Sequence, residues 1–177
     1  KNPYCRFCRE AKMYKSHCRP CSHDDEPTEF GKKVTADTLW SKRKNSRGMD
    51  GSKYAHVIYD IGTDWLHSAS TAGRSQMEAT VAFQEFAGPE QKIVSFYCDN
   101  ASELKRAARN LEWINPTSTP FRSETNARAE RKVRHVEEGT RTVLMSAGLN
   151  NIFWPIGAKY FCDSENFRII NGDSSWN

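Results

Sequence analysis

The sequence predicts an α/β fold in which a mixed central sheet is flanked by helices. Three observations favour this class: short apolar or alternating segments typical of strands, later segments with helical spacing, and alternation of the two kinds along the second half. With 177 residues, 37% of them hydrophobic and 27% charged, the chain is long enough to bury one sizeable core beside a small appendage.

Four segments have strand character. Residues 33–39 alternate in polarity, residues 54–60 form a short apolar run, and residues 65–70 are expected to return beside them as a hairpin partner. A fourth strand is predicted over 93–98, and it delivers Asp99 at its C-terminal end.

Two helices are predicted around the fourth strand. Ala79, Ala82, Phe83 and Phe86 recur at helical spacing in a segment that ends at Gly88-Pro89. Apolar residues between 104 and 111 repeat as one helical face.

Two more helices are predicted beyond Pro120. The longer covers about 124–147, where Gly139 costs about 1 kcal/mol relative to Ala and predicts a bend or break. Gly148 is placed to cap it, and residues 152–162 form a last apolar helix with Trp154-Pro155 as a packing anchor. Hairpin strands followed by alternating strands and helices are the order of ribonuclease H-like domains.

Four cysteines near the start form two C-x2-C pairs, Cys5 with Cys8 and Cys18 with Cys21. Paired spacing of this kind suits Zn²⁺ better than a disulfide framework. We therefore predict a partial zinc-binding module and linker over residues 1–29, followed by a core domain over 30–177. The alternative is free thiols in a linker.

Charge is unevenly distributed. Residues 1–50 carry 12 Lys or Arg against 7 Asp or Glu, whereas residues 51–177 are nearly neutral apart from a basic stretch over 105–141. Such a distribution suits a polyanion such as DNA, although a solvated surface is the simpler alternative. No segment has the length of a membrane span or the form of a secretory signal, and the chain starts without Met. We expect a piece of a longer protein that is not secreted and has no membrane partner.

Three carboxylates occupy positions where they could converge. Asp37 lies within the first strand, Asp99 ends a later strand and Glu130 begins the long helix. Carboxylates on adjacent strands and on a crossing helix can hold two Mg²⁺ ions for phosphoryl transfer. Each has an alternative: turn capping for Asp99, and a helix ion pair with Arg131 or Arg134 for Glu130. Asp60 and Asp64 are rival ligands, with turn capping as the alternative for Asp60.

Five landmarks in order resemble copia-type retrotransposon integrases, over nearly the whole chain. The first two are residues 2–13 around Cys5 and Cys8, and Val34-Thr35-Ala36-Asp37. The others are residues 97–104 around Asp99, residues 119–131 around Glu130, and residues 147–155 ending in Trp-Pro.

The resemblance implies a ribonuclease H-like core with Asp37, Asp99 and Glu130 as the catalytic triad, which holds two Mg²⁺ or Mn²⁺ ions per active site. It also implies that Asn126 orders the active-site loop. Residues implied or expected to contact DNA phosphates are Lys105, Arg128, Arg131, Lys132 and Arg134. The implied reaction is processing of element DNA ends and joining of their 3′-hydroxyls to target DNA, by a homo-multimer in a nuclear or cytoplasmic retroelement particle.

The sequence departs from the family pattern in several places. Only 30 residues separate Asp99 from Glu130, and Ala101 and Ala127 stand where the family has glycine. The two histidines that complete the family's zinc site would precede Lys1. Two other hypotheses therefore remain open: a catalytically inactive relic that only binds nucleic acid, and a cellular metal-dependent nuclease of the same fold.

Overall fold

The computed structural model describes residues 27–41, 46–89, 92–99, 101–114, 127–169 and 174–176. Its centre is a four-stranded sheet with the order β3-β2-β1-β4. The strands are β1 (Val34–Trp40), β2 (Tyr54–Asp60), β3 (Leu66–Thr71) and β4 (Phe96–Cys98). β1, β2 and β3 are antiparallel neighbours, and β4 is parallel to β1. The sheet is therefore mixed, as the sequence predicted.

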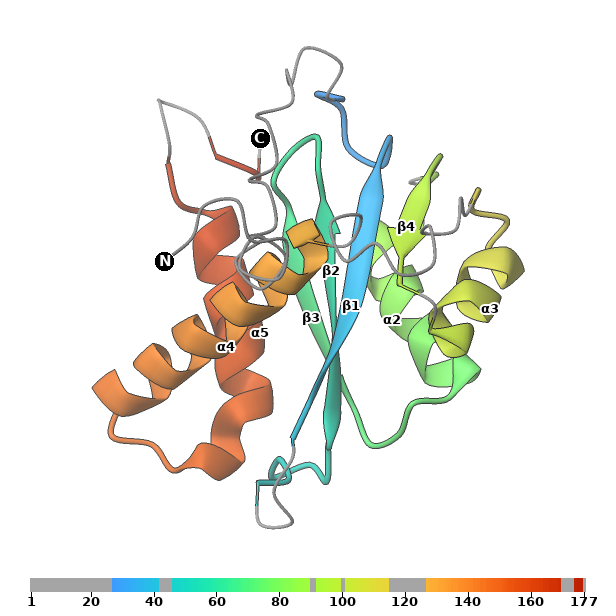
Figure 1. Ribbon diagram of the computed structural model, residues 1–177. Helices are drawn as coiled ribbons and strands as arrows, with labels where there is room; N and C mark the ends of the chain where they lie inside the picture. Colours follow the sequence, from blue (N-terminus) through green and yellow to red (C-terminus); the bar gives the residue numbers. More distant parts are fainter. Residues whose placement is uncertain are drawn as a thin grey trace, which may run out of the picture.

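Two helices cover each face of the sheet (Figure 1). On one side lie α2 (Gln76–Ala87) and α3 (Ser102–Asn110), and on the other lie α4 (Ala127–Ser146) and α5 (Trp154–Asn166). A short 3-10 helix, η2 (Asn151–Phe153), leads into α5. Among the described residues, no helix is long and apolar enough to cross a membrane.

Alternation along the strands produces two cores. Val34 and Ala36 of β1 and Ile58 of β2 are buried with residues of α2 and α3. Val57 and Tyr59 are buried on the opposite face with residues of α4 and α5. Because successive side chains of a strand point to opposite faces, Asp37 shares the α4 face with Leu39, whereas Thr38 faces α2 and α3.

The helix boundaries agree with the sequence at several caps. Ser75 and Glu78 form a capping box at the start of α2, and Gly88 follows its end. Gly148 has the positive φ of 65° that was expected after α4. The last helix is longer than predicted, since η2 and α5 together run to Asn166. The Asn166 side chain accepts from the Leu66 amide and donates to the Leu66 carbonyl at the start of β3, both at 2.8 Å.

Two expectations were wrong in detail. The predicted strand over 93–98 is reduced to β4, preceded only by an isolated bridge between Ser95 and Ile114. The predicted break at Gly139 does not occur, because α4 continues through it; the ring of Phe161 on α5 packs where a Cβ would lie. Gly139 therefore serves close helix packing.

Trp154-Pro155 acts as the predicted packing anchor at the start of α5. The indole Nε1 of Trp154 donates to the Ser46 carbonyl at 3.0 Å, and the Met49 amide donates to the Ile152 carbonyl at 2.8 Å. The ring of Pro155 packs so closely on Gly48 that a Cβ there would clash. The loop after β1 is thereby fixed against α5.

Candidate active site

Asp37 lies in β1, and Asp99 directly follows β4, the strand that runs parallel to β1. The register pairs Thr35 with Tyr97 and Ala36 with Cys98, so the next positions along the two strands are Asp37 and Asp99. The Thr38 amide donates to Asp37 Oδ1 at 2.7 Å. Asp99 Oδ1 accepts from the Ala101 amide at 2.9 Å, which turns the chain into α3. Turn capping, the alternative role considered for Asp99, is therefore present and keeps its side chain next to β1.

Glu130 comes from the helical layer on the other face of the sheet from α3, the helix that follows Asp99. It lies in the first turn of α4, the helix that packs on the face to which Asp37 points, and it is exposed. The charges of Asp99 and Glu130 both raise the pKa of Asp37. The three carboxylates are thus close enough to influence one another, although they are 30 residues or more apart in sequence.

The Asp37 carboxyl has a pKa of about 6, well above its usual 3.8. Burial is the largest cause; the Thr38 amide opposes it, Asp99 and Glu130 raise the pKa further, and Arg74 lowers it. A carboxylate in such a place is costly to ionise without a nearby cation.

The donor set fits a hard divalent cation, since carboxylate oxygens are the ligands that Mg²⁺ prefers. Among the described residues, however, no group of three or more His, Cys, Asp or Glu side chains is arranged closely enough to hold a metal ion. The carboxylates affect the pKa of Asp37 without being close enough to share a metal ion, because charge repulsion acts over a longer distance than metal coordination. In this conformation the carboxylates are neighbours without forming a closed cage.

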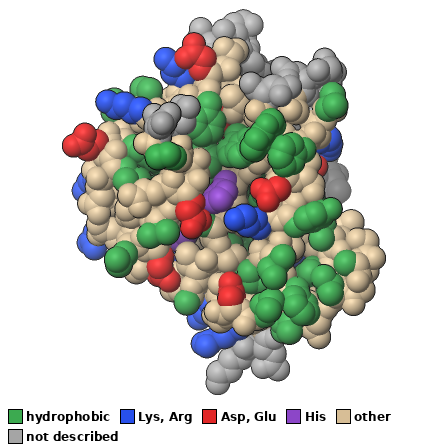
Figure 2. Space-filling view, turned by 180° about the vertical axis from the view of Figure 1, so that it is seen from behind, with side chains coloured by type: hydrophobic (Ala, Val, Ile, Leu, Met, Phe, Trp, Pro, Cys, Tyr) green, Lys and Arg blue, Asp and Glu red, His purple; other side chains and the backbone are tan. Residues whose placement is uncertain are grey.

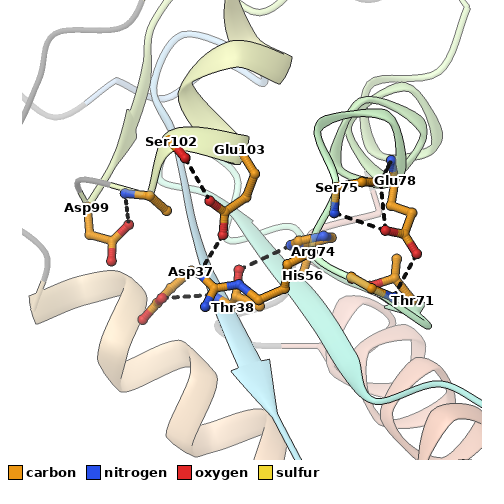
Figure 3. A network of polar contacts seen from close by, with 12 residues as sticks. Asp37, Thr38, His56, Thr71, Arg74, Ser75, Glu78, Asp99, Ser102 and Glu103 are labelled. Atoms are coloured by element: carbon orange, nitrogen blue, oxygen red, sulfur yellow. Dashed lines mark hydrogen bonds and ion pairs between the residues drawn. The ribbon is translucent and has the colours of Figure 1, made fainter.

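A second polar network lies on the other side of Asp37 (Figure 3). Arg74, in the loop between β3 and α2, forms an ion pair with Glu103 in the first turn of α3. The Glu103 side chain is 14% exposed; burial acts to raise its pKa, but its own backbone amide and Arg74 hold the pKa below its usual value. The pair brings a guanidinium near the carboxylates.

His56 of β2 lies beneath this ion pair and is fully buried. Its Nδ1 is 3.2 Å from Thr38 Oγ1, and its Nε2 has no hydrogen-bond partner among the described residues. Burial lowers the pKa of His56, and the Arg74 charge lowers it further, while Glu103 and Glu78 oppose the shift. A neutral imidazole here supports the strand that carries Asp37.

Sequence reasoning did not single out Arg74, Glu103 or His56. Glu103 offered a signal, because it lies four residues after Asp99 and falls within one of the family landmarks. Arg74 directly precedes the Ser75 cap of α2, and His56 lies in an apolar run; neither pattern indicates a site.

Asp60 and Asp64, the two rival ligands, lie elsewhere. Asp60 is fully buried and accepts from the Gly31 amide at 2.9 Å and from the Thr63 amide and hydroxyl at 2.8 and 2.9 Å. Asp64 accepts from the Tyr59 hydroxyl and lies 3.6 Å from Lys132 Nζ. Neither is among the charges that perturb Asp37. Turn capping, the alternative considered for Asp60, is its role in the structure.

The five cations expected to contact DNA do not form one group. Lys105 is half-buried on α3, and Arg134 lies one turn after Glu130 on an exposed part of α4. Arg128, Arg131 and Lys132 instead line a pocket together with residues of β2 and the end of α5. The remaining predicted site residues, Asn126 and the cysteines Cys5, Cys8, Cys18 and Cys21, lie outside the described residues.

The chain has the ribonuclease H-like α/β fold of integrase catalytic cores. This follows from the mixed sheet between two helical layers and from its similarity to solved structures. No protein-family model matches the chain, and no curated protein matches it.

Retroviral proteins are among the similar structures. A chain of the simian T-cell lymphotropic virus intasome, solved in complex with PP2A regulatory subunit B56 gamma, superposes with a TM-score of 0.71 over 97% of this chain at 15% identity. The HTLV-2 integrase catalytic core in complex with magnesium gives a TM-score of 0.61 at 15% identity, covering 82% of this chain and 94% of that one. The BIV integrase catalytic core gives 0.58 at 11% identity, with 82% and 91% covered. The chain spans 62% of the intasome chain it matches.

Proposed function

We propose that this chain is the catalytic core of a retroelement integrase, a two-metal-dependent polynucleotidyl transferase. The observation that carries the proposal is the placement of Asp37 in β1 beside Asp99, which directly follows the parallel strand β4, with Glu130 approaching from α4. The fold supports it, because structurally similar chains include integrase catalytic cores, one of them in complex with magnesium. The landmarks around Asp99 and Glu130 favour a copia-type element.

The three carboxylates would hold Mg²⁺ or Mn²⁺, which would supply an activated attacking oxygen and stabilise the leaving oxygen of the phosphodiester. Asp37 and Asp99 form the fixed part of the site, because backbone amides hold both side chains. Glu130 is exposed on the first turn of α4, and its approach would close the site. Arg74, held by Glu103, would offset negative charge beside Asp37.

The natural protein would act as a multimer on DNA ends, in a nuclear or cytoplasmic retroelement particle. Similar integrase cores are described in dimeric and trimeric forms. Apolar side chains available to such an interface include Met77 and Val81 of α2 and Ile156 and Tyr160 of α5, which are 47–78% exposed. Figure 2 shows the molecule from behind, with hydrophobic side chains gathered in several groups among a few charged ones.

A disintegration assay tests the proposed activity. The protein is incubated with a branched DNA substrate and Mn²⁺ or EDTA, beside Asp99→Asn and, as a control of equal charge change, the exposed Asp163→Asn. Disintegration reverses joining and depends least on other domains. Metal-dependent resealing by the wild type and Asp163→Asn, but not by Asp99→Asn, is expected.

Two other outcomes would overturn the proposal. Cleavage by water without resealing would indicate a metal-dependent nuclease of the same fold. No product from folded, DNA-binding protein would indicate an inactive relic that only binds nucleic acid.

A further inference from the structure

The first two turns of α4 present cations on one flank and Glu130 on another. Arg128, Arg131, Lys132 and His135 recur at i, i+3, i+4 and i+7, so they share one face of the helix. Glu130 and Arg134 share a different face. The buried stripe that includes Ala129 and Val136 separates the two flanks on the sheet side. The cationic flank therefore faces a different region from the carboxylates.

These four side chains line a pocket of about 590 Å³. Its other walls are Tyr59 near the end of β2, Glu165 in the last turn of α5 and Arg168 just beyond that helix. We call this the α4–α5 pocket. Its residues come from three elements, so the tertiary structure assembles it and no sequence motif indicates it.

Packing positions the first cation of the pocket. Lys132 Nζ lies 4.0 Å from the centroid of the Tyr59 ring and 3.6 Å from Asp64 Oδ1. Its side chain is 29% exposed, and burial lowers its pKa although Asp64 opposes the shift. The ammonium group is thus held in place on a rigid element.

Glu165 positions two more groups. Its carboxylate is 2.9 Å from His135 Nε2 and 3.4 Å from the Arg168 guanidinium. The His135 ring also meets the Phe161 ring edge-on, with centroids 5.0 Å apart. One acid therefore orients an imidazole and a guanidinium within the same pocket.

The charge of the pocket is positive. Four basic side chains, Arg128, Arg131, Lys132 and Arg168, line it against one lining acid, Glu165, and the adjacent Asp64. Guanidinium groups match the oxygens of a phosphate in a planar fork. The pocket therefore suits a phosphate group that is held by several cationic side chains at once.

We propose that the α4–α5 pocket binds a backbone phosphate of a DNA segment other than the one whose phosphodiester reacts at the carboxylates. The choice of DNA rests on the proposed function, since a polynucleotidyl transferase must hold a second DNA beside the reacting one. In this arrangement α4 lies between the two DNA segments, with one segment on each of its flanks.

DNA binding by single variants tests this assignment. Anisotropy of a short fluorescent duplex is titrated with wild type, Arg131→Gln and Arg168→Gln at several salt concentrations, with Arg141→Gln as the control on a distant part of α4. Each pocket variant should weaken Kd about threefold to tenfold and reduce the logarithmic salt slope by about 1. Arg141→Gln should match the wild type, and thermal unfolding should show that all variants are folded.

A variant of opposite sign sharpens the test. Glu165→Gln removes the lining acid and should tighten DNA binding about twofold to fivefold, whereas the exposed Glu138→Gln on α4 should leave it unchanged. Equal binding by Arg131→Gln, Arg168→Gln and Arg141→Gln would overturn the pocket assignment, as would equal effects of Glu165→Gln and Glu138→Gln. Competition by pyrophosphate alone, with no loss of DNA binding in the variants, would assign the pocket to a small phosphate instead.

Different measurements test the proposed integrase activity and the proposed DNA contact at the α4–α5 pocket, so the failure of one can be told from the failure of the other. Asp99→Asn should abolish resealing and leave duplex binding intact, whereas Arg168→Gln should weaken duplex binding. Loss of resealing activity in every preparation would overturn the proposed function while the binding data still decide the pocket.

Discussion

The ring of Phe161 on α5 packs directly on Gly139 of α4, in the space that a Cβ would occupy. This contact lets the two helices approach closely on the face of the sheet that carries Asp37. The position of α4 also sets the position of Glu130, nine residues earlier on the same helix. Helix packing far from the carboxylates therefore bears on their arrangement.

Gly139→Ala should destabilise the protein by about 1 to 3 kcal/mol, because the added methyl group forces the Phe161 ring or the helix to move. In an open helix the same change would stabilise by about 1 kcal/mol. The sign of the change in urea-unfolding free energy therefore tests the packing. The exposed Glu138→Ala on the same helix should shift it by less than about 0.5 kcal/mol, and a Gly139→Ala protein as stable as wild type would contradict the contact.

The raised pKa of Asp37 predicts a pH dependence of stability. The folded protein holds this proton up to about pH 6, whereas the unfolded chain releases it near 3.8, so stability should fall as the pH rises through that window. Asp37→Asn cannot ionise and therefore removes this fall in stability with rising pH. In EDTA it should stabilise the protein by about 1 to 2 kcal/mol at pH 7, after allowance for partial exposure, and by nearly nothing near pH 4.

Thermal unfolding at several pH values measures this difference, with the exposed Glu138→Gln as control. Added Mg²⁺ should then raise the Tm of the wild type at pH 7 and not that of Asp37→Asn, since only the wild type offers the carboxylate. An equal rise in Tm of both proteins on addition of Mg²⁺ would show that Asp37 is not a metal ligand.

The Arg74–Glu103 ion pair should support metal binding indirectly. Arg74 is the smallest of the causes acting on the pKa of Asp37 and lowers it, so Arg74→Ala should raise that pKa slightly and weaken Mn²⁺ affinity by up to about twofold near pH 6.5. Arg74→Lys keeps the charge and should match the wild type. Isothermal titration with Mn²⁺ measures the effect against Arg141→Ala. The loss should shrink as the pH rises and Asp37 ionises in both proteins; a pH-independent loss would point to a merely structural role.

Asp60 should matter for stability and not for metal binding. Asp60→Ala leaves three donors of Gly31 and Thr63 without their carboxylate partner and should cost about 2 to 4 kcal/mol. Mn²⁺ affinity of the folded variant, measured at low temperature, should equal that of the wild type. Reduced affinity with unchanged stability would instead make Asp60 a ligand.

Much of the fold could be predicted because its signals are local. Alternation over 33–39 and the apolar run over 54–60 correspond to β1 and β2, and helical spacing from Ala79 to Phe86 corresponds to α2. The caps at Gly88 and Gly148 follow from backbone conformations that glycine adopts easily. The error at Gly139 arose because propensity cannot show which ring lies opposite a glycine.

The sequence by itself determined the element order, the fold class and the candidates Asp37, Asp99 and Glu130, since periodicity, capping residues and motif spacing are all properties of neighbouring residues. Only the tertiary structure decided that Asp37 and Asp99 lie side by side, that Asp60 caps a turn, and that Arg74 meets Glu103. It alone brought Arg128, Arg131 and Lys132 together with Arg168 in one pocket and left Lys105 and Arg134 outside it. The physical reason is that strand register, burial and electrostatic coupling depend on distances between residues far apart in the chain, and those distances exist only once the sheet and its helices have packed.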